Sequence, residues 1–496
     1  MPKSQGRALD RKKLLADPIL VAAIIGIFLF LFLFILYPLA ILLTDSVVVE
    51  KNINGTTLKT IGFANFIKIF KMTNFRHAIS NTLWLGLISG IGSTVIGFLF
   101  AYVDSYVDVG SKIVKKLFGV VSILPVVSPP FVLSLSAILL FGRTGVITRG
   151  LFNMNNTQLY GWRGIALVQI LTFFPVCYMM LKGLLKNIDP SLEEAARNMG
   201  AGRFKVFQTV TFPLLLPGIG NAFLVSFIES VADFANPMII GGNFDTLATS
   251  IYLQLTGAYD KSGATAMAVV LLVISMGLFI LEKYWLERKS VATLTGKATR
   301  GRAAITDSSV RIPLVTICTL LTVFVISMYI LVPFGSLFKI WGRDYHLSLK
   351  WYEYIFKNKG YRVFTDSMLL SAIASPITAF LSMIIAYLVV KRKFFAKGFM
   401  EFVAMLAMAV PGTVLGVGFI RGYNSGLFHS GILSGLYGTG AILVIVFIVR
   451  SLPIGTRSGI AALRQIDRSI EEAAYDMGAD SAKVFQTVTL PLIKES

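Results

Sequence analysis

Long apolar runs separated by short polar segments dominate the pattern of this chain. The first run, from Ile19 to Leu43, exceeds the roughly 20 residues that an α-helix needs to cross a bilayer. It is longer than the apolar part of a signal peptide and lacks a small-residue cleavage site, so it predicts a retained anchor. Nine further runs predict membrane spans at residues 78–104, 117–141, 163–183, 214–234, 264–282, 312–338, 366–390, 399–420 and 436–456.

The composition agrees with an all-α, polytopic membrane protein. Hydrophobic residues make up 55% of the 496 residues and charged residues only 15%, and the mean hydropathy is +0.73. The two cysteines, Cys177 and Cys318, fall in different predicted spans, so we expect neither a disulfide framework nor a CxxC site. We interpret both as small core residues.

One polar stretch occurs twice in this apolar chain. EEAARNMGAGRFKVFQTVTFPLL begins at Glu193 and EEAAYDMGADSAKVFQTVTLPLI begins at Glu471, and the two copies agree at 16 of 23 positions without a gap. Other matching positions are Ala101 with Ala386, Tyr102 with Tyr387, and Pro130 with Pro411. The similarity therefore extends over most of the chain.

An even number of predicted spans separates the two copies, so the repeat is parallel and two six-span halves would enclose a pore. The second half stops soon after Pro491, and we expect its last two spans to be missing from this sequence. The expected parts are a cytoplasmic N-terminus at 1–17, a first half at 18–282, a basic cytoplasmic linker at 283–311 and a second half at 312–496.

Basic residues set the expected orientation. With the N-terminus inside, 30 of the 46 Lys and Arg fall on the inner side, as the positive-inside rule predicts. Both copies of the polar stretch then face the cytoplasm, after the fourth and tenth spans. Because the net charge of +20 is explained by membrane orientation, we expect no nucleic-acid partner.

Each copy predicts a short helix, over Leu192–Gly200 in the first, that ends at a glycine turn. Carboxylates in the first turn suit the positive end of a helix, alanines let another surface approach, and glycine permits the turn. A helix lying on the lipid surface is the alternative, but retention of these positions in both copies favours a protein partner. The positions are Glu193, Glu194, Ala195, Ala196 and Gly200, then Glu471, Glu472, Ala473, Ala474 and Gly478.

The spacing resembles the signature loop of the membrane subunits of binding-protein-dependent ABC importers. It reads Glu-Ala-Ala, three residues, Gly, nine residues, an aliphatic, one residue, an apolar residue and Pro, and it closes on Pro213 and Pro491. The resemblance implies that each loop docks in a cleft of an ATPase subunit, where its glutamate pairs with a basic residue. ATP-driven closure would then swing the halves between inward-open and outward-open. The chain has no GxxxxGK[ST] loop, so we expect two separate ATPase subunits as partners.

Two permease halves fused in one chain resemble the ferric iron importers in particular. The stretches Leu124–Gly145 and Ser226–Tyr252 carry this resemblance, and thiamine, phosphonate and polyamine importers are the alternatives. The resemblance implies an extracytoplasmic substrate-binding protein that holds the metal, an inner-membrane location, and no resident cofactor or metal in the permease.

Rival classes fit the sequence less well. An ion-gradient-driven secondary transporter often has twelve spans in two parallel halves, but it has no use for twin cytoplasmic loops. An enzyme is not indicated, because no nucleophile, base or metal constellation occurs at a meaningful spacing.

The three histidines, His77, His346 and His429, are too scattered to predict a metal cluster. Two aromatic and basic outer segments, 51–77 and 343–362, would receive the binding protein or lie at the lipid interface.

Two carboxylates, Glu229 and Asp233, lie four residues apart in the fifth predicted span. A carboxylate inside a membrane costs roughly 2.5–3.5 kcal/mol on insertion scales, so we expect both on one helical face toward a wet cavity or a partner. An acidic patch on a cation path is the hypothesis, and hydrogen bonds between helices are the alternative.

The matched prolines Pro130 and Pro411 predict broken helices along the path, with ordinary kinks as the alternative.

Overall fold

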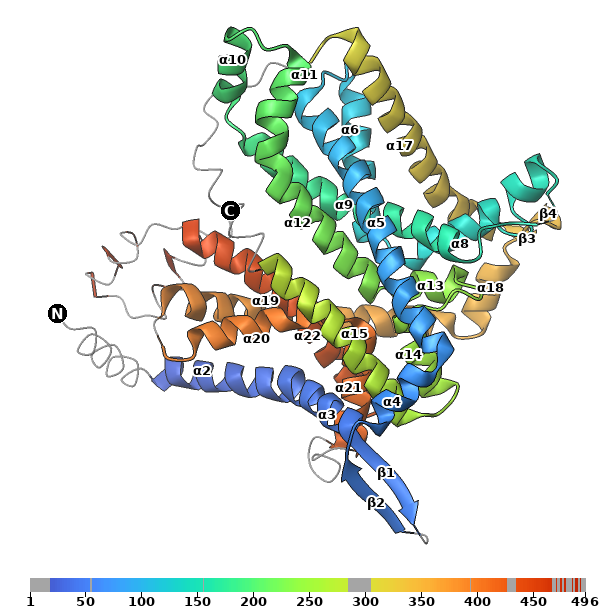
Figure 1. Ribbon diagram of the computed structural model, residues 1–496, viewed down its shortest axis with the longest axis vertical. Coiled ribbons are helices and arrows are strands. Elements are labelled where there is room, and N and C mark those ends of the chain that lie inside the picture. The colour runs from blue at the N-terminus through green and yellow to red at the C-terminus, as the bar shows by residue number, and fades with distance from the viewer. Residues whose placement is uncertain are drawn as a thin grey trace. The chain divides into compact units, whose positions relative to one another are not determined.

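The computed structural model describes residues 18–53, 56–154, 156–283, 305–392, 394–425 and 434–465, together with single positions between 470 and 491. Its chain forms two compact units, one of residues Val47–Asn358 and one that joins Met1–Ser46 to Lys359–Ser496. Helices dominate both units (Figure 1), as the apolar runs predict.

The unit Val47–Asn358 contains two hairpins and most of the long helices. Its strands are β1 (Val48–Ile53), β2 (Thr56–Ile61), β3 (Phe338–Ile340) and β4 (Asp344–Leu347), which pair as antiparallel β1–β2 and β3–β4. Its helices are α4 (Ala64–Lys71), α5 (Thr73–Tyr106), α6 (Lys112–Val121), α7 (Leu124–Val127), α8 (Phe131–Phe141), α9 (Trp162–Asn187), α10 (Pro190–Asn198), α11 (Arg203–Val206), α12 (Phe212–Ala232), α13 (Ala235–Ile240), α14 (Leu247–Thr256), α15 (Lys261–Leu281), α17 (Ser308–Ser336) and α18 (Lys350–Lys357). Two π-helical segments, Val146–Leu151 and Phe207–Thr211, complete it.

The other unit is built from both ends of the chain. Its helices are α2 (Pro18–Leu31), α3 (Tyr37–Val47), α19 (Gly360–Lys391), α20 (Lys397–Ala409), α21 (Gly412–Ser425) and α22 (Gly440–Gln465), with a π-helical turn, Phe32–Leu36, between α2 and α3 and a 3-10 turn, Ser434–Leu436, before α22. The two segments noted in the sequence, 51–77 and 343–362, each overlap a hairpin followed by a short helix, β1–β2 with α4 and β3–β4 with α18. The sequence pattern did not predict these hairpins.

The described residues contain nine helices long and apolar enough to cross a membrane, and a bent pair supplies a tenth. They correspond to the ten predicted runs with one shift. The third run was predicted over 117–141, but the chain breaks around Ile123 and again at Ser128, so that the spanning segment is Phe131–Leu151. Extended backbone at Ser128 followed by two prolines prevents a continuous helix there.

The first span of the first half, Leu20–Val47, packs with helices of the second half, and the first span of the second half, Ser308–Ser336, packs with helices of the first half. The Tyr37 hydroxyl donates to the Gly422 carbonyl at 3.0 Å, and Arg421 pairs with Asp45 at 2.6 Å. In the other unit α17 packs on α8, where the Ser136 hydroxyl donates to the Met328 carbonyl at 2.6 Å. The compact units thus follow packing, and the division into halves at 18–282 and 312–496 stays a prediction from the repeat.

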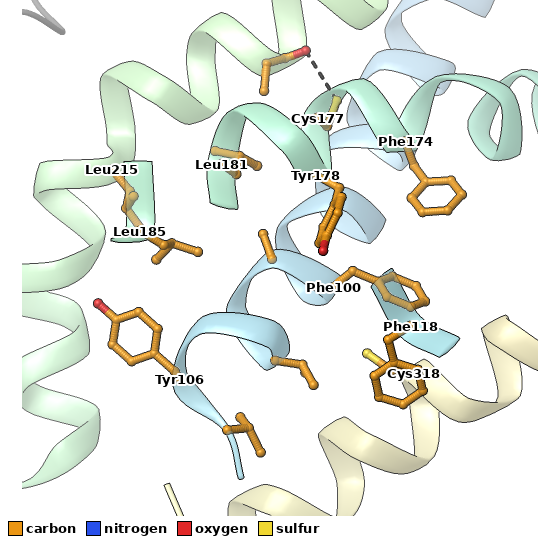
Figure 2. Close-up of a cluster of buried hydrophobic side chains, with 14 of the residues drawn as sticks. Phe100, Tyr106, Phe118, Phe174, Cys177, Tyr178, Leu181, Leu185, Leu215 and Cys318 are labelled. Carbon is orange, nitrogen blue, oxygen red and sulfur yellow. Dashed lines mark hydrogen bonds between the residues drawn. The ribbon is translucent and has the colours of Figure 1, made fainter. Parts of the chain in front are cut away.

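A close contact between α5 and α9 forms the centre of the larger unit. Phe100 from α5 lies 5.6 Å from the Phe174 ring and 5.9 Å from the Phe118 ring, measured between ring centroids. Figure 2 shows these rings with Tyr178 and the two cysteines. Cys177 and Cys318 are both buried and free, and the interpretation of them as core residues is confirmed.

We expect Gly97→Ala to lower the thermal unfolding midpoint of the purified protein by several degrees. An added Cβ would lie 2.5 Å from Cys177 Cβ and 2.8 Å from the Tyr178 backbone nitrogen, so α5 and α9 would have to separate, at a cost of about 1–3 kcal/mol. Gly183→Ala in α9 is the matched control, because no atom lies within 4 Å of its added Cβ. Equal midpoints for the two variants would contradict this packing.

Candidate functional site

The first copy of the repeated stretch forms α10 and the turn after it. The Asp189 side chain caps the helix by accepting from the Ser191 N–H at 2.9 Å, and this bond lowers the pKa of that carboxyl from its usual value. Pro190 then takes the first helical position. The helix was expected over 192–200, but this cap starts it at Pro190, and it ends at Asn198 before Gly200.

The two adjacent glutamates of α10 have different environments. Glu193 is only 3% exposed, and its Oε1 accepts hydrogen bonds from the Tyr106 hydroxyl at 2.7 Å and the Thr211 hydroxyl at 2.8 Å. Figure 2 shows Tyr106 with its hydroxyl pointing away from Phe100 and Phe118. Glu194, by contrast, is exposed. Glu193 therefore ties α10 to the end of α5 and to the turn before α12, and Glu194 remains on the surface.

The exposed side of this segment is apolar as well as acidic. Leu192, Met199 and Phe204 are all exposed although they are large hydrophobic residues, and Ala195 lies between them on the surface. Ala196 is buried within its own unit, so only one of the two alanines is presented outward. Arg197 of the same helix is exposed too, so this surface is apolar with one carboxylate and one guanidinium, a mixture found at sites for other proteins.

The described positions of the second copy repeat this arrangement. Glu471 and Glu472 lie outside the described residues. Met199 and Met477 are each 82% exposed, and each donates its backbone N–H to the carbonyl four residues earlier at 3.1 Å. Further equivalent pairs are Ala196 and Ala474, each 6% exposed, the buried Val206 and Val484, and the π-helical Thr209 and Thr487.

Both glycines of the repeated stretch have a left-handed backbone. Gly200 has φ +86° and Gly478 has φ +82°, in the region that side chains other than glycine rarely adopt. No atom lies within 4 Å of a Cβ built on either one, so the backbone conformation and not space requires glycine. The two glycines therefore share one backbone conformation, and the methionine before each of them is exposed.

Asp233 does not share a helical face with Glu229, contrary to the expectation. Helix α12 ends at Ala232, and Asp233 has extended backbone with ψ 123°. Its Oδ1 accepts from the Ala235 and Asn236 backbone N–H groups, and its Oδ2 accepts from the Gln169 and Asn236 side-chain amides at 2.8 and 2.9 Å. All four acceptor positions of the carboxylate are used by protein donors.

The Asp233 network joins five helices of the larger unit. Gln169 from α9 accepts from the Ser89 hydroxyl of α5 at 2.8 Å and from the Ser230 hydroxyl of α12 at 2.6 Å. Asn236 of α13 accepts from the Ser134 hydroxyl of α8 at 2.7 Å. Because a buried polar group without a partner is costly, this set holds the break after α12 in one geometry.

Both predicted proline breaks are present. Pro130 immediately precedes α8, after the extended residue Ser128. Pro411 lies between α20 and α21, whose axes differ by 109°. Irregular backbone at membrane depth is tolerated where it lines a cavity or packs against protein, so both breaks are compatible with a path. Whether cargo passes them stays a prediction.

A polar cavity of about 470 Å³ lies at the end of α5 remote from α10. Asn74, His77 and Asn81 line it from one face of α5, opposite the loop that carries Asn243 and Asp245. The Asn81 amide donates to the Asp245 carbonyl at 2.9 Å.

The two described histidines lie in different elements. His77 belongs to α5 and not to a loop, His346 lies in β4, and His429 falls outside the described residues. Within the described part of the chain, no three His, Cys, Asp or Glu side chains are grouped to hold a metal.

Comparison with known proteins adds a family match. Residues 93–290 and 378–495 match the model of the family described as binding-protein-dependent transport system inner membrane component. The matched parts include both copies of the repeated stretch. A crystal structure of a bacterial ABC transporter for alginate import aligns with a TM-score of 0.46 and 21% identity, covering 56% of this chain and 98% of that chain.

Two curated relatives match along nearly the whole chain. A ferric transport system permease protein of Actinobacillus pleuropneumoniae is 35% identical over 492 residues, 97% of this chain and 69% of the relative. A permease protein of Haemophilus influenzae, also named for ferric transport, is 35% identical over 493 residues, 97% of this chain and 75% of the relative.

We expect Glu193→Leu to speed amide hydrogen exchange in α10, because the Tyr106 and Thr211 hydroxyls lose their shared acceptor inside the protein. The lost bonds are worth about 1–3 kcal/mol of local stability. Glu193→Gln keeps an acceptor oxygen and should exchange more slowly than the leucine variant. Glu194→Leu is the surface control and should match the wild type. Similar exchange for all three variants would remove the anchoring role of Glu193.

Proposed function

Because this chain belongs to the binding-protein-dependent transport system inner membrane component family, we propose that it is the permease of an ATP-driven importer of ferric iron. The permease of an ABC importer is a multi-pass protein of the inner membrane. The proposal adds the cargo, the cytoplasmic N-terminus and the coupling sites. The identical exposure of Met199 and Met477 next to left-handed glycines is the observation that carries the coupling proposal, since two equivalent ATPase subunits need two equivalent surfaces.

In the proposed coupling, each loop transmits the movement of an ATPase subunit into the membrane helices. Glu194 and Met199 contact the ATPase, while the buried Glu193 joins the same helix to α5 and α12. A force on α10 therefore acts directly on both spanning helices. Since α5 has 34 residues, about 51 Å of helix at 1.5 Å per residue, its far end moves with it.

The proposed path for cargo runs along the broken helices of the two halves. Glu229 is half-buried near the end of α12 and supplies negative charge, and Asp233 supports the wall through its hydrogen bonds. We include the breaks at Pro130 and Pro411 in this proposal as the path segments of their respective halves. The polar cavity around His77 and Asp245 lies at the end away from the ATPases, where a substrate-binding protein would release its cargo. The carboxylate and amide oxygens of this lining suit a hard metal cation, and the His77 imidazole is a borderline donor.

Alternative cargoes and energy sources remain open to test. Thiamine, phosphonate and polyamine importers share the loop pattern, and iron is favoured because the full-length relatives are named for ferric transport. A secondary transporter would need an ion gradient and no ATPase.

We expect the double variant Glu194→Lys and Glu472→Lys to lose co-purifying ATPase subunits and the ATP hydrolysis that loaded binding protein stimulates. Charge reversal places a cation against the proposed basic socket without disturbing Glu193. The control Glu353→Lys changes an exposed glutamate of α18 and should retain both activities. Retention of both by the double variant, with uptake that collapses when the ion gradient is removed, would favour the secondary transporter.

We expect Glu229→Gln to lower ferric iron uptake into proteoliposomes several-fold with an unchanged thermal midpoint, because the path loses its charge while the fold keeps its packing. Asp233→Asn should instead lower the midpoint, since one carboxylate oxygen that accepts two hydrogen bonds becomes a donor. Unchanged uptake by the Glu229 variant would end the cation-path proposal. If the wild type took up thiamine, a phosphonate or a polyamine but not iron, that compound would replace ferric iron as the proposed cargo.

A further inference from the structure

Helix α6 carries a group of basic side chains that belong neither to the proposed coupling sites nor to the proposed cargo path. Lys112, Lys115 and Lys116 have i, i+3 and i+4 spacing, which places them on one side of the helix. With Asp104 of α5 and Lys182 of α9 they line an open cavity of about 470 Å³. Asp104 and Lys182 neutralise each other in an ion pair of 2.8 Å. Among the described residues, none of the three lysines of α6 has an ion-pair partner.

An exposed apolar stripe runs beside these lysines. Ile113, Leu117 and Val120 follow one another at helical spacing and are all exposed, and Ile123 continues the stripe beyond the helix. The opposite side of α6 is buried through Phe118. The helix thus has a buried face, a cationic face and an exposed aliphatic face, a combination typical of helices at a membrane surface.

The position along the membrane helices supports this assignment. Asp104 is two residues before Tyr106, the residue that holds Glu193 of α10. Lys182 lies near the end of α9, directly before α10 in the chain. The basic cavity is therefore at the same end of α5 and α9 as the coupling helix, at the boundary between the apolar spans and the polar loops.

We propose that this cavity binds the headgroup of an anionic phospholipid, with the phosphate at the three lysines and the acyl chains along the aliphatic stripe. The aliphatic face selects a lipid over a soluble anion, because a soluble anion would leave Ile113, Leu117 and Val120 in water. Each basic residue near an anionic membrane surface adds about fivefold in affinity, so three should add at least tenfold after screening. The site holds α6 and the end of α9 together and so steadies the start of α10. It does not depend on the identity of the cargo.

The test reconstitutes the full chain in vesicles of equal parts phosphatidylcholine and phosphatidylglycerol and measures by native mass spectrometry which lipids stay bound after extraction. The wild type should retain phosphatidylglycerol selectively. The triple variant Lys112→Gln, Lys115→Gln and Lys116→Gln should lose at least about tenfold of that selectivity. The triple arginine variant at the same positions should keep it, because the charge remains.

A matched control keeps the result specific to α6. Replacement of Lys350, Lys357 and Lys359 by Gln removes the same charge elsewhere and should leave the selectivity intact. Thermal midpoints of all variants report whether each one is folded. Equal phosphatidylglycerol retention by the wild type and the α6 glutamine variant would overturn the proposal. Displacement of the lipid by excess inorganic phosphate would also overturn it, since the site would then bind a soluble anion.

Discussion

Backbone groups within a bilayer have no water to bond with, and this constraint decides where the chain can depart from a helix. The chain departs from a helix next to two described spans, at Ser128 and Asp233, and within the bent pair at Pro411. At Asp233 the cost is met by a carboxylate that accepts four hydrogen bonds and by amide and hydroxyl partners on five helices. The irregular segment after α12 therefore has a defined structure. Its polar residues bond to one another, and this structural role does not require cargo.

Buried hydrogen bonds also link the membrane helices to the proposed ATPase-binding surface. Glu193 accepts hydrogen bonds from two hydroxyls on separate elements and so connects α10 to the end of α5 and to the π-helical segment before α12. Its neighbour Glu194 is exposed beside Met199 and Gly200. Glu193 fixes α10 to its own unit, and Glu194 lies on the surface of the same helix. In the proposed coupling, these two environments would let a short surface helix act on helices that cross the membrane.

In the proposed coupling, close packing would carry that movement through the larger unit. Gly97 lets α5 and α9 approach until Cβ of Cys177 is 2.5 Å from the position of an added Cβ. The polar cavity and the coupling helix lie at opposite ends of α5, while the basic cavity of α6 lies at the coupling end. The proposed site of cargo release is therefore separated along α5 from the proposed ATPase and lipid contacts, so it can be changed by mutation without them.

The sequence alone determined the spans, the repeat and the glycine turns, because these are local properties. An apolar run of sufficient length satisfies its own backbone as a helix, and a left-handed turn is readily formed by Gly200 or Gly478 whatever surrounds it. Only the tertiary structure distinguished Glu193 from Glu194, since Tyr106, 87 residues away, makes the difference. Tertiary packing also ended α12 at Ala232 and placed the first span of each half in the other unit. Those outcomes depend on partners distant in sequence, which no local pattern encodes.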